Sequence, residues 1–187
     1  MTVTAGVPHR GPWTVDDLYD LPDDGNRYEI FDGSLIVTPA PAVPHGYSTY
    51  RLGNLLTRQA PAELCVLVIP IGVDVRRRRS YFIPDLVVVP EAVMHTTAAN
   101  LSPSDVLLVA EVLSPSNRAN DLVLKRHDYA AAGMPQYWLV DPVEHTLTVL
   151  VLDKGATSYR ESAVVKPGET WRTDRPFPIA LDPAEVC

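Results

Sequence analysis

Two nearly continuous apolar segments in the middle of the chain, Phe82–Val89 and Val106–Leu113, constrain the fold more than any other feature. Strands made of unbroken apolar runs are covered on both faces, as in the centre of an α/β sheet. Covering both faces of a sheet requires further layers, which in this class of fold are helices. The sequence therefore predicts an α/β sandwich in which helices flank a mixed sheet.

The remaining elements follow from turn residues and from apolar spacing. Asp32-Gly33 predicts a tight N-terminal β-hairpin. An apolar stripe at helical spacing indicates a helix that Pro61 ends, and a second helix ends at Gly133. In chain order we expect a short helix at Val15–Tyr19, hairpin strands at Arg27–Phe31 and Ser34–Thr38, a helix at His45–Gln59, strands at Leu64–Val75, Phe82–Val89 and Val106–Leu113, a helix at Ala119–Ala132, strands at Gln136–Val140 and Thr146–Leu152, and one or two edge strands in the tail. After the hairpin, the core order is α-β-β-β-α-β.

The length of 187 residues is most simply one domain, with a core at about 26–152 and a C-terminal edge segment at 153–187. Cys65 and Cys187 do not make a disulfide framework, which fits a reducing compartment. The first residues contain no apolar signal segment, and no apolar stretch approaches the roughly 20 residues of a membrane span. We therefore expect a cytoplasmic protein with no membrane partner.

The net charge of −7 argues against broad, non-specific binding of nucleic acid. It does not exclude a nuclease, because carboxylates that surround a cation count as negative charge while the cation is absent. The one basic concentration is Arg76–Arg79, four arginines in a row. A solvated turn is the more common role of such a run, and a phosphate clamp is the alternative.

Glu111 is the only charged residue in the segment VLLVAEVLS, which should be a buried strand. An isolated carboxylate there would cost several kcal/mol or take up a proton unless a cation meets it. Two interpretations follow: a structural ion pair, or a metal ligand at the end of the strand.

Asp85 shifts the balance toward a metal site. It directly precedes the strand Leu86–Val89, and the next strand ends near Glu111. If the two strands are antiparallel neighbours, the two carboxylates lie close together, and a cation between them would let both stay ionised. Oxygen ligands of this kind select Mg²⁺ or Mn²⁺. Taken alone, Asp85 is also a common turn residue beside a proline.

The helix after Glu111 supplies a third candidate. Asp121, Lys125 and Tyr129 are spaced i, i+4, i+8 and share one helix face, which can look at the carboxylates when the helix packs on the sheet. A lysine ammonium there would orient the attacking water or stabilise the transition state. The alternative is a solvated Asp–Lys pair.

These residues carry a resemblance to a known family. The stretch 105–142, DVLLVAEVLSPSNRANDLVLKRHDYAAAGMPQYWLVDP, preceded by IPDLVVV, is similar to the Uma family, described as putative restriction endonucleases of the PD-(D/E)XK superfamily. Pro84-Asp85 matches the first part of that pattern and Glu111 the second. The lysine position of the superfamily falls on Leu113, a departure, whereas Lys125 matches the position to which the lysine has moved in the Uma family.

The resemblance spans about residues 28–150 and implies a restriction-endonuclease-like fold. Its opening, RYEIFDGSLIVTPAPAVPH, places Glu29 and His45 at the acidic and histidine positions of the family. Glu29 is then a further metal or water ligand, with a strand-surface glutamate as the alternative. His45 is a substrate contact, with helix capping as the alternative.

The function implied is a metal-dependent DNA endonuclease. Asp85 and Glu111, with the carbonyl of Val112, would hold Mg²⁺ or Mn²⁺, and Lys125 would support the nucleophile. Asp121 and Tyr129 would position Lys125, DNA would be the substrate, and a homodimer is possible, as in many relatives. The alternative function is a non-cleaving binding or accessory protein of a mobile element or defence system, and a third is a structural dimer whose carboxylates form internal ion pairs.

Overall fold

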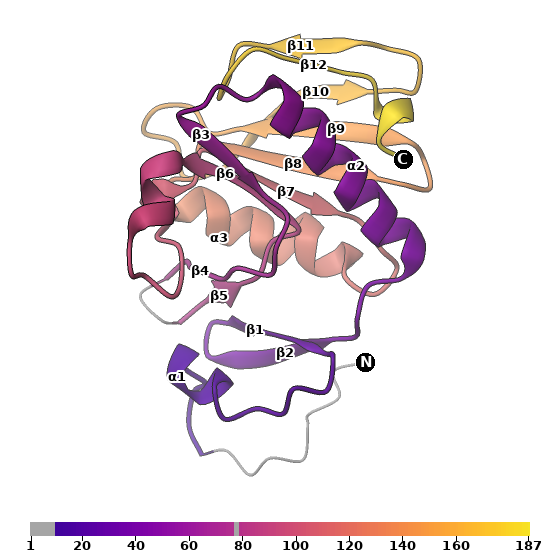
Figure 1. The fold of residues 1–187 in the computed structure, drawn as a ribbon. Coiled ribbons are helices and arrows are strands. Elements are labelled where there is room, and N and C mark those ends of the chain that lie inside the picture. The colour runs from indigo at the N-terminus through magenta and orange to yellow at the C-terminus, as the bar shows by residue number, and fades with distance from the viewer. Residues whose placement is uncertain (1–9, 77–78) are drawn as a thin grey trace.

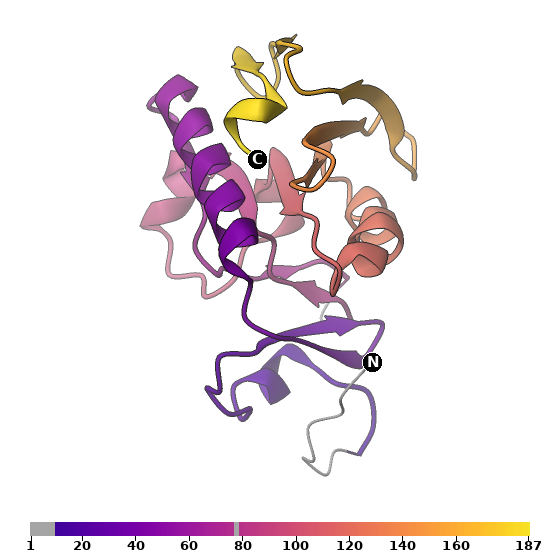
Figure 2. The same cartoon turned by 90° about the vertical axis from the view of Figure 1, so that its right-hand side faces the viewer.

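The computed structural model describes residues 10–76 and 79–187 (Figure 1). Within these residues the strands form three sheets: six strands in the order β10-β9-β8-β7-β6-β3, four in the order β2-β1-β5-β4, and the pair β11-β12. The six-stranded sheet lies between α2 and α3, which Figure 2 shows on opposite sides. The hairpin β1-β2 and the short α1 lie beyond one end of this sandwich.

The elements have the following bounds. The helices are α1 Val15–Leu18, α2 Val43–Gln59 and α3 Arg126–Ala131, with a π-helix at Asn120–Lys125 and 3₁₀ turns at Glu91–His95, Pro103–Asp105 and Pro183–Glu185. The strands are β1 Arg27–Phe31, β2 Ser34–Thr38, β3 Leu64–Leu67, β4 Val73–Asp74, β5 Tyr81–Phe82, β6 Leu86–Pro90, β7 Leu108–Val112, β8 Gln136–Asp141, β9 Thr146–Val151, β10 Arg160–Val165, β11 Trp171–Thr173 and β12 Ile179–Leu181.

The central sheet is mixed, as predicted: β7 runs antiparallel to β6 and parallel to β8. Side chains alternate along each strand and so divide between two hydrophobic cores. Ala110 belongs to the core that contains Leu52 of α2, whereas its neighbour Val109 belongs to the core that contains Tyr129 of α3. The expectation that the apolar strands are covered on both faces is confirmed.

Prolines divide two of the expected strands. The segment expected as one strand at Leu64–Val75 is β3 and β4, which belong to different sheets, with Pro70 between them. The segment Phe82–Val89 is likewise split into β5 and β6 at Pro84. Proline has no N–H for a strand ladder, so each proline ends the pairing. The strand expected at Val106–Leu113 is present as the shorter β7.

Both long helices depart from expectation near their starts. α2 begins at Val43 rather than His45, because Pro44 is well tolerated in the first turn of a helix. The helix expected over Ala119–Ala132 begins as the π-helix, and only its second half is α-helical. π-Helical turns inside helices are frequent at functional sites.

The N-terminal hairpin is confirmed, with Phe31 paired to Ser34 across a two-residue turn. Asp32 and Gly33 have φ values of 45° and 79°, the positive angles that such a hairpin turn requires. β1 also pairs with β5 through Ile30 and Tyr81. The hairpin is therefore attached to the segment that leads directly into Asp85.

The tail holds three strands instead of the one or two expected. β10 is an edge strand of the six-stranded sheet, and β11 and β12 form a separate pair that packs near α2. Cys65 and Cys187 are free thiols. Among the helices of the described residues, none is long and apolar enough to cross a membrane.

Candidate active site

A buried lysine lies at the centre of the predicted residues. Lys125 Nζ is 3.0 Å from Glu111 Oε1, 3.0 Å from Glu29 Oε1 and 3.4 Å from Asp121 Oδ1. The Tyr129 hydroxyl donates a 3.0 Å hydrogen bond to Glu111 Oε1. We call these five residues the Lys125 cluster; each is at most 3% exposed.

The helix face predicted from the i, i+4, i+8 spacing does meet the carboxylate of Glu111. Alternation along β7 places Glu111 on the side of the sheet that α3 covers, because Val109 and Leu113 pack in that core. Tyr129 differs from the expected role, since its hydroxyl bonds Glu111 rather than Lys125. The interpretation of Lys125 and Asp121 as a solvated pair is wrong, because both side chains are buried.

Glu29 belongs to this cluster, and its interpretation as a strand-surface residue is wrong. Besides pairing with Lys125, its Oε1 accepts a 2.8 Å hydrogen bond from the backbone N–H of Ile83. The N-terminal hairpin thus holds one carboxylate of the site and fixes it to the segment before β6.

Asp85 lies beside this cluster. Leu86 pairs with Ala110 in the antiparallel register of β6 and β7, so one step further along the ladder Asp85 comes opposite Glu111. Its Oδ1 accepts from Arg27 at 2.9 Å, and its Oδ2 accepts from the N–H of Val112 at 2.9 Å. The antiparallel arrangement on which the sequence argument depended is confirmed.

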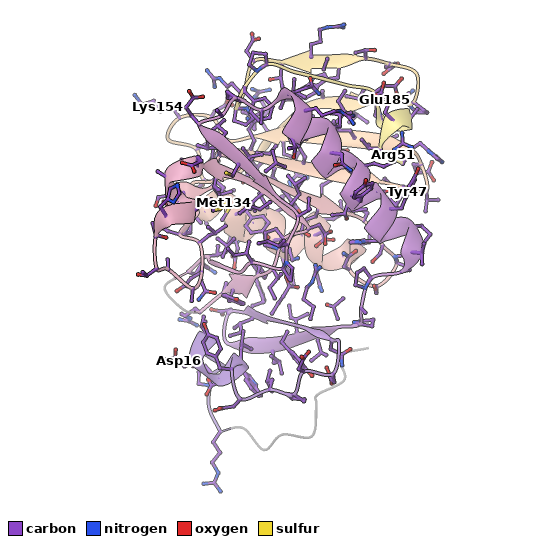
Figure 3. The ribbon with its side chains drawn as sticks, in the orientation of Figure 1. Asp16, Tyr47, Arg51, Met134, Lys154 and Glu185 are labelled. Atoms are coloured by element: carbon purple, nitrogen blue, oxygen red, sulfur yellow. The ribbon has the colours of Figure 1, made fainter. Side chains whose placement is uncertain are left out.

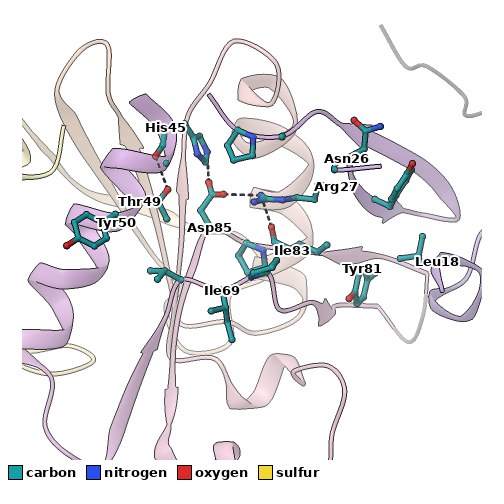
Figure 4. A pocket seen from close by; sticks show the side chains of 18 of the residues that line it. Leu18, Asn26, Arg27, His45, Thr49, Tyr50, Ile69, Tyr81, Ile83 and Asp85 are labelled. Atoms are coloured by element: carbon teal, nitrogen blue, oxygen red, sulfur yellow. Dashed lines mark hydrogen bonds and ion pairs between the residues drawn. The ribbon is translucent and has the colours of Figure 1, made fainter. Parts of the chain in front are cut away.

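His45 and Arg27 complete the surroundings of Asp85, and we call the three the Asp85 group (Figure 4). His45 Nε2 is 3.0 Å from Asp85 Oδ2, so the ring binds the carboxylate and does not cap α2, whose N-cap is Ala42. Sequence reasoning missed Arg27. The available signal was its position two residues before Glu29, which places both on one face of β1.

Among the carboxyl groups of the site, the pKa of Asp85 is lowered, whereas those of Glu111 and Asp121 are raised. Burial alone would raise the pKa of Asp85, but the hydrogen bond from His45 and the charges of His45, Arg27 and Lys125 lower it. Burial raises the pKa of Glu111 well above its ordinary value, and nearby carboxylates add to the effect while Lys125 opposes it. Burial likewise raises the pKa of Asp121 to about 6. Burial opposes the charge of Lys125, but the surrounding carboxylates outweigh it and raise its pKa.

Unpartnered carboxyl oxygens in the Lys125 cluster are of the kind that a divalent cation binds. Among the described residues, Glu111 Oε2 and Asp121 Oδ2 are buried without a hydrogen-bond partner. The Lys125 cluster and the Asp85 group together hold four carboxyl groups but only two permanent cations, Arg27 and Lys125. The carboxyl groups therefore outnumber the positive charges beside them. Hard oxygen ligands of this kind suit Mg²⁺ or Mn²⁺.

The described residues contain no ready-made group of three His, Cys, Asp or Glu side chains that could hold a metal. Mg²⁺ does not require one, since it is commonly bound by one or two carboxylates together with waters and phosphate oxygens. The carbonyl of Val112, the expected third ligand, accepts a long 3.5 Å hydrogen bond from Asn117.

The arginine run is partly engaged elsewhere. Arg76 lies 3.3 Å from the buried carboxylate of Asp128, and Arg79 lies 2.7 Å from Asp32 in the hairpin turn. Arg77 and Arg78 lie outside the described residues, so the phosphate clamp stays a prediction for them.

Comparisons with known proteins bear on the family and the fold of this chain. The family model Uma2, described as "Putative restriction endonuclease", matches residues 15–184. A crystal structure described as a "putative nuclease belonging to DUF820" from Anabaena variabilis ATCC 29413 is similar in fold, with a TM-score of 0.73 at 16% sequence identity. That likeness covers 94% of this chain and 97% of the other. None of the curated proteins matches this chain.

Proposed function

The chain belongs to the Uma2 family, and from this premise we propose that it is a metal-dependent endonuclease that hydrolyses phosphodiester bonds in DNA. The observation that carries the proposal is the buried Lys125, paired at 3.0 Å with both Glu111 and Glu29 beside Asp85. Burying several charged groups together is costly for the fold. Such clusters of perturbed ionisable groups are more common at functional sites than elsewhere.

In the proposed mechanism, Asp85 and Glu111 with the Val112 carbonyl would hold Mg²⁺ or Mn²⁺. When bound, such an ion activates water and neutralises charge on the phosphate. Arg27 and His45 release Asp85 for this role and are then free to contact a phosphate oxygen. The ammonium of Lys125 stabilises negative charge that develops at the phosphorus centre. Tyr129 holds Glu111 by its Oε1, and Asp121 holds Lys125.

A non-cleaving nucleic-acid-binding protein of the same fold is the second candidate. The observation in its favour is the burial of the Lys125 cluster, where Glu111 is 0% and Lys125 2% exposed. A substrate phosphate must reach these groups for cleavage, so the endonuclease requires an opening of the site. A binding protein does not.

Cleavage of supercoiled plasmid DNA with Mg²⁺ or Mn²⁺ separates the two candidates. We expect nicked or linear product from the wild-type chain and none from Asp85→Asn, Glu111→Gln or Lys125→Met. Glu144→Gln, at an exposed carboxylate in the turn between β8 and β9, is the matched control and should cleave like wild type. Equal activity in the wild type and all three site variants would mean a contaminating nuclease and would sink the enzyme proposal.

Metal binding has its own test. A ligand that binds only the folded state raises its stability, by about 2.7 kcal/mol at 100 times the Kd. Millimolar Mn²⁺ should therefore raise the melting temperature of the wild type and not that of Asp85→Asn. No rise in the wild type would remove the metal from the proposal.

Cleavage of both strands of a duplex requires two active sites or two binding events. We therefore include a homodimer in the proposal, with the exposed edges β3 and β10 as the strands that can pair between copies. Light scattering of the purified chain measures this directly. A monomer at all concentrations would restrict the proposal to nicking one strand at a time.

A further inference from the structure

We infer that the cavity beside Asp85 binds an unstacked nucleobase, so that the preferred ligand is single-stranded or unpaired nucleic acid. The inference rests on the proposed function and names its substrate class. It begins from the position of the cavity, which meets the candidate site at Asp85, Arg27 and His45 (Figure 4). A base held there would have its phosphate next to the carboxylate proposed to bind metal.

The cavity has a volume of about 660 Å³ and lies between α1, the hairpin strand β1, the start of α2 and the segment before β6. Pockets that take small organic groups span about 300–1,000 Å³ and are mostly apolar with a few polar groups. This cavity has room for a base and its sugar, whereas the base pairs of an intact duplex are stacked inside the helix. A strand must therefore present an unstacked base to enter it.

The walls carry aromatic and apolar side chains that remain exposed. Tyr50 of α2 is 63% exposed, Tyr19 is 68% exposed, and Ile69, which also lines the cavity, is 57% exposed. A ligand that covers these side chains removes their apolar surface from water, which favours binding. Base stacking on an aromatic ring is sequence-tolerant, because every base has a π-face.

One polar side chain that lines the cavity has a nitrogen without a hydrogen-bond partner among the described residues. His45 lines it, is only 7% exposed, and has a buried Nδ1 for which the described residues offer no hydrogen-bond partner. A buried nitrogen without a partner is costly to the folded state. A base edge or a phosphate oxygen within the cavity would supply the missing hydrogen bond if the ring turns toward it.

Charge next to the cavity favours an anion, although the chain as a whole carries −7. α2 contains no Asp or Glu but does contain Arg51 and Arg58. Arg51 donates a 2.8 Å hydrogen bond to the hydroxyl of Tyr47, and the two lie next to each other along α2 (Figure 3). A second, smaller hollow shares Tyr50 with the main cavity and is lined by both arginines against one carboxylate, that of Glu185.

These features together define one ligand chemistry: a flat apolar group joined to a chain of anions. A nucleic-acid strand with an unpaired base has this combination, with the base in the cavity and the adjoining phosphates along α2. An acidic peptide with an aromatic side chain also combines the two properties, so such a peptide serves as a competitor in the binding test.

Fluorescence anisotropy of a short labelled oligonucleotide, measured on the full chain in EDTA so that no cleavage occurs, tests the inference. The single strand should bind more tightly than the same sequence as a blunt duplex, and a duplex with one unpaired base should recover part of the difference. Gly46→Leu fills the cavity from a position where an added Cβ meets open space. Thr57→Leu, exposed on the same helix and outside the cavity, is its matched control.

We expect Gly46→Leu and Tyr50→Ala each to weaken single-strand binding about tenfold, which is within the usual effect of losing one stacked base. Tyr50→Phe keeps the ring and should bind like the wild type, as should Thr57→Leu. Equal affinity of Gly46→Leu and wild type, tighter binding of the blunt duplex, or displacement of the oligonucleotide by an acidic tyrosine-containing peptide at lower concentration would each overturn the inference.

The plasmid assay separates failure of this inference from failure of the proposed function. Metal-dependent cleavage without cavity-dependent binding overturns the nucleobase site alone. Binding that depends on Tyr50 and Gly46 without any cleavage supports the nucleobase site and overturns the endonuclease.

Discussion

The Asp85 group and the Lys125 cluster each combine buried carboxyl and basic side chains, yet Asp85 and Glu111 behave in opposite ways. Both oxygens of Asp85 accept hydrogen bonds, from Arg27, His45 and the N–H of Val112, and its pKa is lowered. In the Lys125 cluster, one oxygen of Glu111 lacks a partner within the described chain, and the pKa of this carboxyl is raised.

Burial does not explain the difference, because Asp85 is 4% and Glu111 0% exposed. The number of hydrogen bonds and cations per carboxylate explains it: the charged form is favoured where donors saturate it and disfavoured where desolvation dominates. The saturated carboxylate of Asp85 lines the cavity, and the unsaturated one of Glu111 is not among the lining residues. The unsaturated region is therefore where an added cation would gain most.

Removal of Lys125 should have the largest effect. Lys125→Met leaves the carboxylates of Glu29, Glu111 and Asp121 buried without their shared cation, and breaking a buried pair in this way costs about 3–5 kcal/mol. The loss should shrink as the pH falls toward the ordinary carboxyl range, because protonated carboxyls no longer need the cation. Urea unfolding at neutral and mildly acidic pH measures both. A loss that grows as the pH falls would contradict the account of the cluster.

Removal of Arg27 should cost less, about 1–2 kcal/mol, because its side chain is 23% exposed and Asp85 keeps two other donors. The pKa of Asp85 is lowered in the folded state. The ionised carboxylate therefore stabilises the fold above the ordinary carboxyl pKa, and this stabilisation is lost as the pH falls through the pKa that Asp85 has in the folded state. The difference between wild type and Arg27→Ala in metal-free buffer should thus be constant near neutral pH and narrow below about pH 4. Arg172→Ala, at an exposed arginine of β11, is the control.

Replacement of Asp121 should change stability in the other direction. Burial raises its pKa from 3.8 to about 6, so the folded state binds the extra proton and loses stability as the pH rises through this range. Asp121→Asn removes that loss and should stabilise the metal-free protein by about 1 kcal/mol at neutral pH, less than the full linkage value because Lys125 loses a partner. The gain should vanish near pH 4 in the same unfolding experiment. A destabilised variant at neutral pH would show that the ion pair outweighs desolvation.

An ion pair outside both regions should give the smallest effect. Arg118 lies 2.6 Å from Asp141, but its side chain is 50% exposed, and the backbone N–H groups of Val143 and Glu144 also bond the carboxylate. Arg118→Ala should cost about 0.5 kcal/mol. A loss as large as that of Arg27→Ala would mean that hydrogen bonds from the backbone do not substitute for a cation, and the contrast between the two regions would need another cause.

The sheet and the pair Asp85–Glu111 were predictable because their signals are local. Unbroken apolar runs mark central strands, and one charge within such a run demands a partner. The spacing of Lys125 and Tyr129 then indicates which helix face supplies that partner. Each step uses residues within one element or its neighbour in the chain.

The partners of Asp85 were not predictable in the same way. Arg27 reaches it because β1 pairs with β5, a contact between segments about 50 residues apart, and His45 reaches it because α2 crosses the sheet at this point. The splitting of Phe82–Val89 at Pro84 was visible in the sequence, but the sheet that each half joins depends on the whole fold. Long-range pairing, rather than residue preference, decides these features.

The π-helix at Asn120–Lys125 bears on how this site can be gained or lost. A π-turn accommodates one residue more than an α-turn, so this segment contains a residue that an ordinary α-helix leading into α3 would not need. Deleting one residue between Asp121 and Lys125 would let the segment close as an ordinary α-helix, with the two side chains three positions apart and still on one helix face. The extra residue of the π-turn is therefore one that the segment can lose while Lys125 still faces Glu111 and every member of the site is retained.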